Sequence, residues 1–318
     1  MSNYLNFMQH ICTSFKNLSV EDEIILTIGN FDGIHKGHST VLNKIKNEAE
    51  NLQVKTAILS FDPHPKVFIN GEKNFLINSK LKKISILKDL GIDYLIELYF
   101  DKDLINLSFN DFEQSILINK LNIKKLYLGK DFRYGNQRKG NIETIKNLCI
   151  EKNILFEEVS LINNVTSNSK VSSSQIRQFI KDGDIHLANE VLVHKFSISN
   201  TVIKGDQRGR TIGIPTANIE YPQNMIKPPY GVYAVELKIL DKIHYGIANF
   251  GMRPTFNKDS AILEAHIFDF DLDIYGSDIE VIFHSKIRDE IKFDGIKELL
   301  KQISLDITVA KQKLNYGN

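Results

Sequence analysis

Residues 23–38 read EIILTIGNFDGIHKGH, and this stretch decides the fold of the first half of the chain. The apolar run over 23–29 predicts a buried strand, and apolar residues between Val41 and Ala49 recur with helical spacing over 37–52. A glycine-rich turn joins the two. A strand that passes through such a turn into a helix is typical of α/β domains, where the helix N-terminus favours anions.

The same alternation continues to about residue 159. It predicts further strands over 55–61, 94–98, 125–128 and 155–159, and helices over 80–90, 110–121 and 141–152. Alternating strands and helices predict a parallel sheet with helices on both faces, which is a Rossmann-like α/β domain. Two short helices, over 174–181 and 185–192, follow it.

After about residue 194 the apolar pattern changes to period two. It predicts antiparallel strands over 196–203, 231–240, 244–249, 261–268 and 278–283. Several such strands without intervening helices predict a small closed β-barrel, followed by a terminal helix over 295–314. We therefore expect two domains, residues 1–185 and residues 186–318.

The composition excludes several classes of protein. The 318 residues suit about two domains. With 40 Lys and Arg against 39 Asp and Glu, a net charge of +1 argues against a protein that coats nucleic acid or an anionic membrane. Two cysteines cannot build a disulfide scaffold or a Cys-only metal site. No apolar run reaches the ~18 residues of a membrane span, and the N-terminus lacks secretory features, so we expect a cytoplasmic protein.

The turn after the first strand carries the first candidate site. His35 and His38 are three residues apart at the predicted helix start, so both rings can face one point beside the helix amides. This arrangement suits nucleotide phosphates, although neither a Walker A nor a G-x-G-x-x-G motif is present. Two surface histidines are the plain alternative, and a zinc site lacks a nearby third ligand. The predicted nucleotide contacts in this turn are Gly29, Asn30, Phe31, Asp32, Gly33 and Gly37.

Three more motifs accompany the histidine turn. They are FDPHP over 61–65 and GKDFRYGNQRKG over 129–140, both after predicted strands, and VSSSQIR over 171–177. The serine run has a simple alternative as a helix N-cap. Since open α/β sheets bind ligands beyond strand ends, together the motifs suit a triphosphate and a flat aromatic substrate.

In order and spacing, the four motifs resemble the adenylyltransferase module of the prokaryotic bifunctional riboflavin kinase/FAD synthetase family. GNFDGIHKGH also resembles the HxGH signature of the wider nucleotidyltransferase superfamily. The resemblance implies that FMN and ATP give FAD and pyrophosphate, with His35 and His38 catalytic and Ser173, Ser174 and Arg177 on the nucleotide. It implies that the flavin contacts are Asp62, Pro63, His64, Pro65, Asp131, Phe132 and Arg133.

The second half has its own polar motifs. In GDQRGRTIGIPTANI over 205–219, Thr216 and Asn218 face one side if this stretch is extended, and their neutral oxygens suit Mg²⁺. A turn followed by an ordinary strand is the alternative. In LEAHIF, Glu264 and His266 point the same way. Glu264 is a candidate general base if that side is the barrel interior or rim, and a solvated surface residue if it is the outside.

These segments, with NFGMRPTF and IRDEIKF, resemble the riboflavin kinase module of the same family. The resemblance implies a six-stranded barrel, Mg²⁺ on Thr216 and Asn218, and Glu264 as the base. It implies that the nucleotide contacts are Gly205, Arg210 and Gly213, and that Arg288 and Glu290 contact the flavin; from the residues alone, this last pair could equally form a surface ion pair. The chain departs from the family at Gln175, Ile214 and Leu272, none of which is assigned to chemistry.

The resemblance thus implies an enzyme that converts riboflavin and ATP to FMN, then FMN and ATP to FAD, with Mg²⁺ as cofactor. It implies small-molecule substrates, no nucleic acid, no membrane and no protein partner, and a homo-oligomer is compatible with it. Three rivals remain: a chain that kept one activity, another HxGH adenylyltransferase, and a flavin sensor. The barrel argues against the second, and retention of Glu264 and the two histidines argues against the third.

Overall fold

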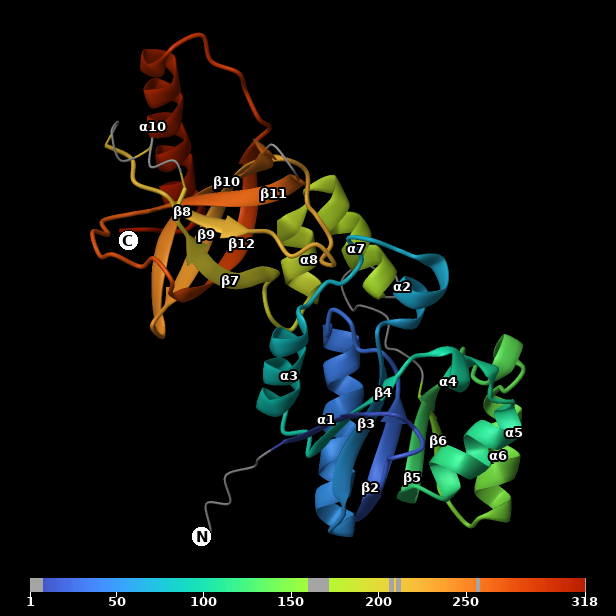
Figure 1. Ribbon diagram of the computed structural model, residues 1–318. Helices are drawn as coiled ribbons and strands as arrows, with labels where there is room; N and C mark the ends of the chain where they lie inside the picture. The colour runs from blue at the N-terminus through green and yellow to red at the C-terminus, as the bar shows by residue number, and fades with distance from the viewer. Residues whose placement is uncertain (1–7, 160–171, 206–208, 210–212, 256–257, 318) are drawn as a thin grey trace. The chain divides into compact units, whose positions relative to one another are not determined.

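The computed structural model describes residues 8–159, 172–205, 209, 213–255 and 258–317 (Figure 1). The chain forms two compact units: residues 1–72 with 80–171, and residues 73–79 with 172–318. These units divide near residue 172, earlier than the predicted boundary at 185/186. The reason is that α7 (Ser173–Asp182) packs on α8 (Ile185–Val191), and α8 packs on the last strand of the barrel.

The first unit is built on a six-stranded parallel sheet with the strand order β1-β4-β3-β2-β5-β6. Its strands are β1 (Gln9–Thr13), β2 (Val20–Ile28), β3 (Lys55–Asp62), β4 (Tyr94–Tyr99), β5 (Leu121–Gly129) and β6 (Leu155–Val159). The predicted parallel sheet is confirmed. Strand β1 was not predicted because it is a short edge strand with partly exposed residues, so it lacks an apolar run.

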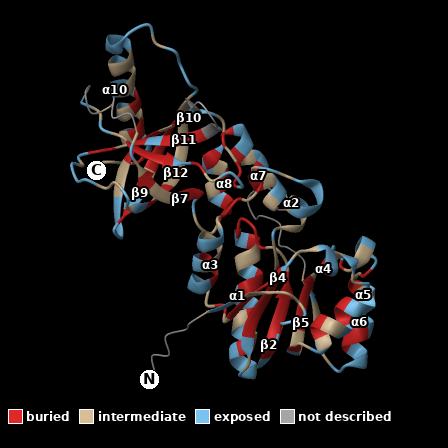
Figure 2. Ribbon diagram, in the orientation of Figure 1, coloured by how far each residue is buried: buried red, intermediate tan, exposed pale blue. Residues whose placement is uncertain are grey.

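Helices cover both faces of this sheet, as predicted, with α1 and α3 on one face and α5 and α6 on the other (Figure 1). The helices are α1 (Lys36–Leu52), α2 (Pro65–Asn70), α3 (Lys80–Asp89), α4 (Lys102–Asn106), α5 (Phe109–Phe112) and α6 (Ile142–Glu151). The predicted helix over 110–121 is α5 followed by a π-helix (Glu113–Ile118), and it ends before Leu121, where β5 begins. The buried residues concentrate in the strands (Figure 2).

The second unit contains a closed antiparallel barrel with the strand order β10-β11-β8-β7-β12-β9. Its elements are β7 (Ser197–Ile203), β8 (Ala217–Glu220), β9 (Gly231–Ile239), β10 (Lys242–Thr255), β11 (Lys258–Ile267), β12 (Asp278–Arg288) and α10 (Ile296–Lys313). The predicted barrel and terminal helix are confirmed. The sixth strand, β8, is the segment that begins within PTAN. Ala310 of α10 packs on Val232, Ala234 and Ile247 of the barrel wall.

Residues 73–79 belong to the second unit although α2 before them and α3 after them belong to the first. The backbone amides of Phe75 and Leu76 donate to the carbonyl oxygen of Asn224, at 2.9 and 3.0 Å. Arg177 of α7 places its guanidinium 3.7 Å from the centre of the Phe75 ring and donates from Nε to the Phe75 carbonyl. Among the described residues, no helix is long and apolar enough to cross a membrane.

Candidate active sites

Three of the predicted motifs follow three neighbouring strands of the parallel sheet. The histidine turn follows β2, FDPHP follows β3, and GKDFRYGNQRKG follows β5, and β2 pairs with both β3 and β5. Because the strands are parallel, their carboxyl ends meet at one edge of the sheet. The chain leaves β2 toward β3 on one side and enters β5 on the other, so this edge is a topological switch point, where such sheets bind ligands.

The histidine turn is folded around the N-terminus of α1. His35 is the N-cap residue, and its Nδ1 accepts a hydrogen bond from the His38 amide at 3.3 Å. An accepting Nδ1 places the proton of the neutral ring on Nε2, which can therefore donate. The two imidazoles stack with centroids 3.7 Å apart. Both rings thus belong to one structure at the helix end, as the spacing predicted.

Burial keeps both histidines neutral. His35 is only 1% exposed, and burial lowers its pKa from 6.5 to about 4. Burial and the neighbouring His35 lower the pKa of His38 well below its ordinary value. At pH 7 the pair offers neutral N–H donors, so it would hold a phosphate by hydrogen bonds and not by net charge.

The rest of the turn closes over this pair. Phe31, at φ +48°, places its ring 4.9 Å from that of His38. A Cβ at Gly29 would come within 3.1 Å of the Phe31 ring, so this position requires glycine or a shift of the ring. Two buried atoms here, Asn30 Oδ1 and His38 Nδ1, have no hydrogen-bond partner. Buried polar atoms without partners are rare, and these two are consistent with a ligand site.

The lowered histidine pKa values predict that the first unit loses stability on mild acidification. Between pH 7 and 5 the unfolded chain protonates His35 with a pKa near 6.5, whereas the folded chain stays neutral down to about pH 4. The unfolded state then binds more protons, so stability falls as the pH falls, by about 2 kcal/mol from His35 alone. Hydrogen exchange of the β2 and α1 amides at the two pH values, corrected for intrinsic rates, measures this loss. Unchanged protection would contradict it.

The segment after β3 is ordered by its own polar groups. β3 ends at Asp62, and His64 caps α2 by accepting a hydrogen bond from the Lys66 amide at 3.1 Å. Pro65 follows as the first residue of that helix. The Asp62 carboxylate accepts a hydrogen bond from Lys80 of α3 at 2.7 Å. The segment after β3 therefore leads directly into a helix.

The segment after β5 is a tight hairpin. Tyr134 and Gly140 exchange two backbone hydrogen bonds, and a Cβ at Gly140 would come within 2.6 Å of the Tyr134 ring. The Tyr134 hydroxyl donates to Glu113 of the π-helix, and burial raises the pKa of that carboxyl. Phe132 stacks on Tyr134 at 5.4 Å. Tyr134 thereby fixes the stretch that holds the predicted flavin contacts Asp131, Phe132 and Arg133.

The predicted nucleotide contacts of α7 lie in the second unit. Ser172 is the N-cap of this helix and accepts a hydrogen bond from the Gln175 amide, which is the simple alternative for the serine run. Ser173 and Ser174 open the helix, and Arg177 is 8% exposed and engaged by Phe75. The nucleotide roles of Ser173, Ser174 and Arg177 stay predictions.

In the barrel, the polar residues of two strands meet. β8 pairs with β11 so that Asn218 lies opposite Glu264, and Glu264 in turn lies opposite Asn249 of β10. Leu263 and Ala265 are fully buried in the core. Glu264 and His266, on the other side of the strand, therefore project away from the core. The sequence alone did not decide whether this side faces the barrel interior, its rim or the outside.

This outward side is not bare surface, because it lines a cavity of about 580 Å³. Glu264, His266 and Asn249 form its barrel wall, and residues 288–293 and α10 form the opposite wall. The cavity is lined by Gly209, Ile214, Thr216, Val232, Ile247, Asn249, Glu264, His266, Arg288, Glu290, Ile291, Lys292, Phe293, Leu299, Ile303 and Asp306. Glu264, itself exposed, therefore lies on the outer face of the barrel in the wall of this cavity, where its carboxylate can reach a bound ligand.

Arg288 has a partner that the sequence did not suggest. Its guanidinium forms a bidentate ion pair with Asp306 of α10, at 2.8 and 3.0 Å, and Asp306 is 2% exposed. The surface ion pair considered for Arg288 and Glu290 is therefore not what fixes Arg288. Both nevertheless line the larger cavity, with the Glu290 carboxylate over Gly251, where a Cβ would meet it at 2.3 Å. Their flavin contacts stay predictions.

A second cavity, of about 340 Å³, lies on the other side of PTAN. Thr216 lines both cavities, while Asn218, Asp271 and Asp273 line only the smaller one. Asn218 is buried, and a Cβ at Gly205 would meet its amide at 2.5 Å. Thr216 therefore lies at the junction of the two spaces, which suits a group passing from a ligand in one to a ligand in the other.

The donor set around Thr216 and Asn218 fits Mg²⁺. It offers a hydroxyl and an amide oxygen, with carboxylates in the wall of the same cavity, and Mg²⁺ prefers such hard oxygens together with substrate phosphates. Of the predicted nucleotide contacts nearby, Gly213 takes a left-handed φ of +79°. Arg210 lies outside the described residues.

Several cavity residues were not found from the sequence. Asn249 stands in the NFGMRPTF motif, and its signal was its alternation with buried Ala248 and Phe250. Asp271 and Asp273 flank Leu272, at a place where no residue was assigned to chemistry from the sequence. Asp306 gave a detectable signal: it is a charged residue among the apolar residues on one side of the final helix.

Comparison with known proteins covers both units. Residues 18–175 match the family model described as FAD synthetase, and residues 192–314 match the one described as riboflavin kinase. A protein of Buchnera aphidicola (subsp. Acyrthosiphon pisum) named bifunctional riboflavin kinase/FMN adenylyltransferase is 37% identical over 300 residues, 93% of this chain and 95% of its own.

The protein of the same name from Escherichia coli K12 is 34% identical over 294 residues, 92% of this chain and 93% of its own. A crystal structure from Streptococcus pneumoniae described as a macrolide-efflux protein is similar in fold. Its TM-score is 0.86 at 29% identity, over 95% of this chain and 98% of that one.

Proposed function

Because the chain belongs to the bifunctional riboflavin kinase/FMN adenylyltransferase family, we propose that it converts riboflavin to FMN and FMN to FAD. The observation that carries the proposal is that each unit holds a polar constellation of its own. The barrel presents Glu264 and Thr216 to a cavity beside α10, and the parallel sheet presents His35 and His38 at its switch point. We assign the kinase step to the barrel and the adenylyl transfer to the sheet.

In the kinase step, riboflavin occupies the larger cavity and ATP the smaller one. Glu264 accepts the proton of the riboflavin 5′-hydroxyl while that oxygen attacks the γ-phosphorus of ATP near Thr216. The O–P bond to the new phosphate forms as the bond to ADP breaks. Catalysis of phosphoryl transfer consists mainly of positioning and charge stabilisation, and the junction at Thr216 supplies the positioning.

Mg²⁺ belongs to this proposal as the cofactor of the barrel. Thr216 and Asn218 would hold it together with phosphate oxygens, and when bound it offsets the charge on the phosphates. Asn218 is fixed for this purpose by its burial between Gly205 and β11. Arg288 and Glu290 would contact the flavin from the opposite wall of the cavity.

In the adenylyl transfer, the FMN phosphate attacks the α-phosphorus of a second ATP, and pyrophosphate leaves. The attacking group is already an anion, so no covalent enzyme intermediate is needed. The Nε2 donor of His35, the ring of His38 and the first amides of α1 hold the leaving pyrophosphate as its charge develops. The segments after β3 and β5 flank this point and would bind the flavin end of FMN. We place both reactions in the cytoplasm.

A time course of flavin products tests the proposal. The pure protein is incubated with riboflavin, ATP and Mg²⁺, and the flavins are separated by chromatography. FMN should appear first and FAD later. FMN alone would contradict the assignment of the sheet, FAD from added FMN but nothing from riboflavin would contradict that of the barrel, and bound flavin without conversion would favour a sensor.

A further inference from the structure

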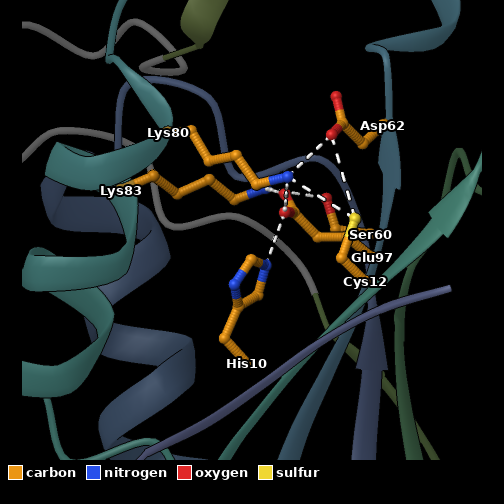
Figure 3. Close-up of polar contacts among 7 residues, drawn as sticks. All are labelled: His10, Cys12, Ser60, Asp62, Lys80, Lys83 and Glu97. Atoms are coloured by element: carbon orange, nitrogen blue, oxygen red, sulfur yellow. Dashed lines mark hydrogen bonds and ion pairs between the residues drawn. The ribbon is translucent and has the colours of Figure 1, made fainter.

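A polar cluster lies beside the FDPHP segment on the sheet face that α3 covers (Figure 3). Strand pairing sets Cys12 of β1, Glu97 of β4 and Ser60 of β3 in one row, because Glu97 lies opposite both of the others. His10 and Asp62 lie two residues along their strands and therefore share that face. From α3, the side chains of Lys80 and Lys83 reach into the cluster (Figure 3).

The two lysines form ion pairs with the carboxylates of Glu97 and Asp62. Lys83 Nζ lies 3.0 Å from Glu97 and 2.8 Å from the buried Ser60 hydroxyl, and His10 contacts the other Glu97 oxygen at 2.8 Å. Glu97 is 3% exposed; burial would raise its pKa, but the charge and hydrogen bond of Lys83 lower it overall. A buried carboxylate needs such partners to remain charged.

Lys80 contacts Asp62, which belongs to the FDPHP segment. Its Nζ lies 2.7 Å from Asp62, 3.3 Å from Glu97 and 3.5 Å from Cys12 Sγ. Burial opposes its charge, but the hydrogen bond that it donates to Asp62 and the charges of Asp62 and Glu97 raise the pKa of Lys80 overall. The ammonium therefore stays charged at neutral pH and holds the Asp62 carboxylate toward α3.

This geometry argues against a metal centre. Ligand atoms of Cys12, Asp62 and Glu97 do lie within 4.8 Å of one another, which is close enough to share an ion. However, the Lys80 ammonium lies within 3.5 Å of all three and already supplies the positive charge. A metal would have to displace this cation and its hydrogen bonds.

We propose that Lys80 is a positioning residue for the adenylyl-transfer site, acting through Asp62 on the segment that binds the flavin end of FMN. The inference rests on the proposed function. Asp62 is the last residue of β3, and His64, two residues later, is the N-cap of α2, so the contact between Lys80 and Asp62 anchors the point where the chain leaves the sheet. Lys80 then holds Asp62, itself a predicted flavin contact, at the edge of the FMN site.

Steady-state kinetics of FAD formation from FMN and ATP test this role. Lys80→Met should raise KM for FMN about tenfold or more, while kcat and KM for ATP stay within about threefold, because a displaced segment weakens binding of one substrate. Lys80→Arg should recover part of the loss. Lys88→Met, on an exposed position of the same helix, removes the same charge and should behave as wild type. Riboflavin phosphorylation by the same proteins should not change.

Asp62 provides the decisive comparison. If Lys80 acts through Asp62, then Lys80→Met adds little to KM for FMN when Asp62 is already Asn, so the two changes are strongly non-additive. Equal KM values in Lys80→Met and Lys88→Met, or fully additive effects with Asp62→Asn, would overturn the proposal. So would a parallel rise in both KM values with loss of thermal stability, which indicates a general structural role. A wild type that makes FMN but no FAD would instead overturn the proposed function, and with it this inference.

Discussion

We expect Glu264→Gln to slow riboflavin phosphorylation by about 10²–10⁴-fold while FAD formation from FMN is unchanged. Glutamine keeps the size of the side chain and its hydrogen-bonding capacity but cannot accept the proton of the riboflavin hydroxyl. Glu264 lies on a strand whose alternate residues, Leu263 and Ala265, are fully buried, so its own position depends on backbone pairing that the substitution leaves intact. Stability should therefore change little. The measurement is single-turnover conversion of riboflavin with saturating ATP.

Glu220→Gln is the matched control for this variant. Glu220 is an exposed residue at the end of β8, two positions beyond Asn218, and lines neither cavity. It should phosphorylate riboflavin at the wild-type rate. Kinase turnover in Glu264→Gln within about threefold of this control would contradict the role of Glu264 as general base. Loss of both reactions in Glu264→Gln would point to a folding defect.

The spacing of apolar residues predicted most of the fold, because most strands and helices show it along their whole length. β2 and β3 are apolar runs, and α1 shows helical periodicity, so their bounds lie within a few residues of prediction. β1 was missed because an edge strand buries too few side chains to leave a pattern. The π-helix was missed because its apolar residues follow the pattern of an ordinary helix, and only the backbone hydrogen bonds distinguish the two.

The site was less predictable because its geometry depends on contacts far apart in the chain. The sequence placed Glu264 and His266 on one side of a strand, but whether that side lines a cavity depends on α10 and residues 288–293. The bidentate pair of Arg288 and Asp306 likewise joins positions that no local spacing relates. Lys80 gave no sequence signal at all, since a lysine at a helix start normally indicates a solvated face.

We expect His38→Ala to reduce FAD formation from FMN by about 10²–10³-fold and to leave riboflavin phosphorylation intact. Removing one preoriented donor from a site of developing negative charge typically has an effect of this size. The neutral ring of His38 is stacked on His35, and its backbone amide is bound to His35 Nδ1, so the donor is fixed before the substrate arrives. Pre-steady-state release of pyrophosphate, with FMN and ATP saturating, measures the chemical step.

The kinase reaction of the same polypeptide serves as an internal control for His38→Ala, because its residues lie in the other unit. His186→Ala, an exposed histidine of α8, controls for removal of a ring and should retain both reactions. Because burial lowers the pKa of His38 well below its ordinary value, the residual activity of the variant should show the same dependence on pH between 6 and 8 as wild type. A changed profile would mean that His38 acts through its charge, and an unchanged rate would remove it from the reaction.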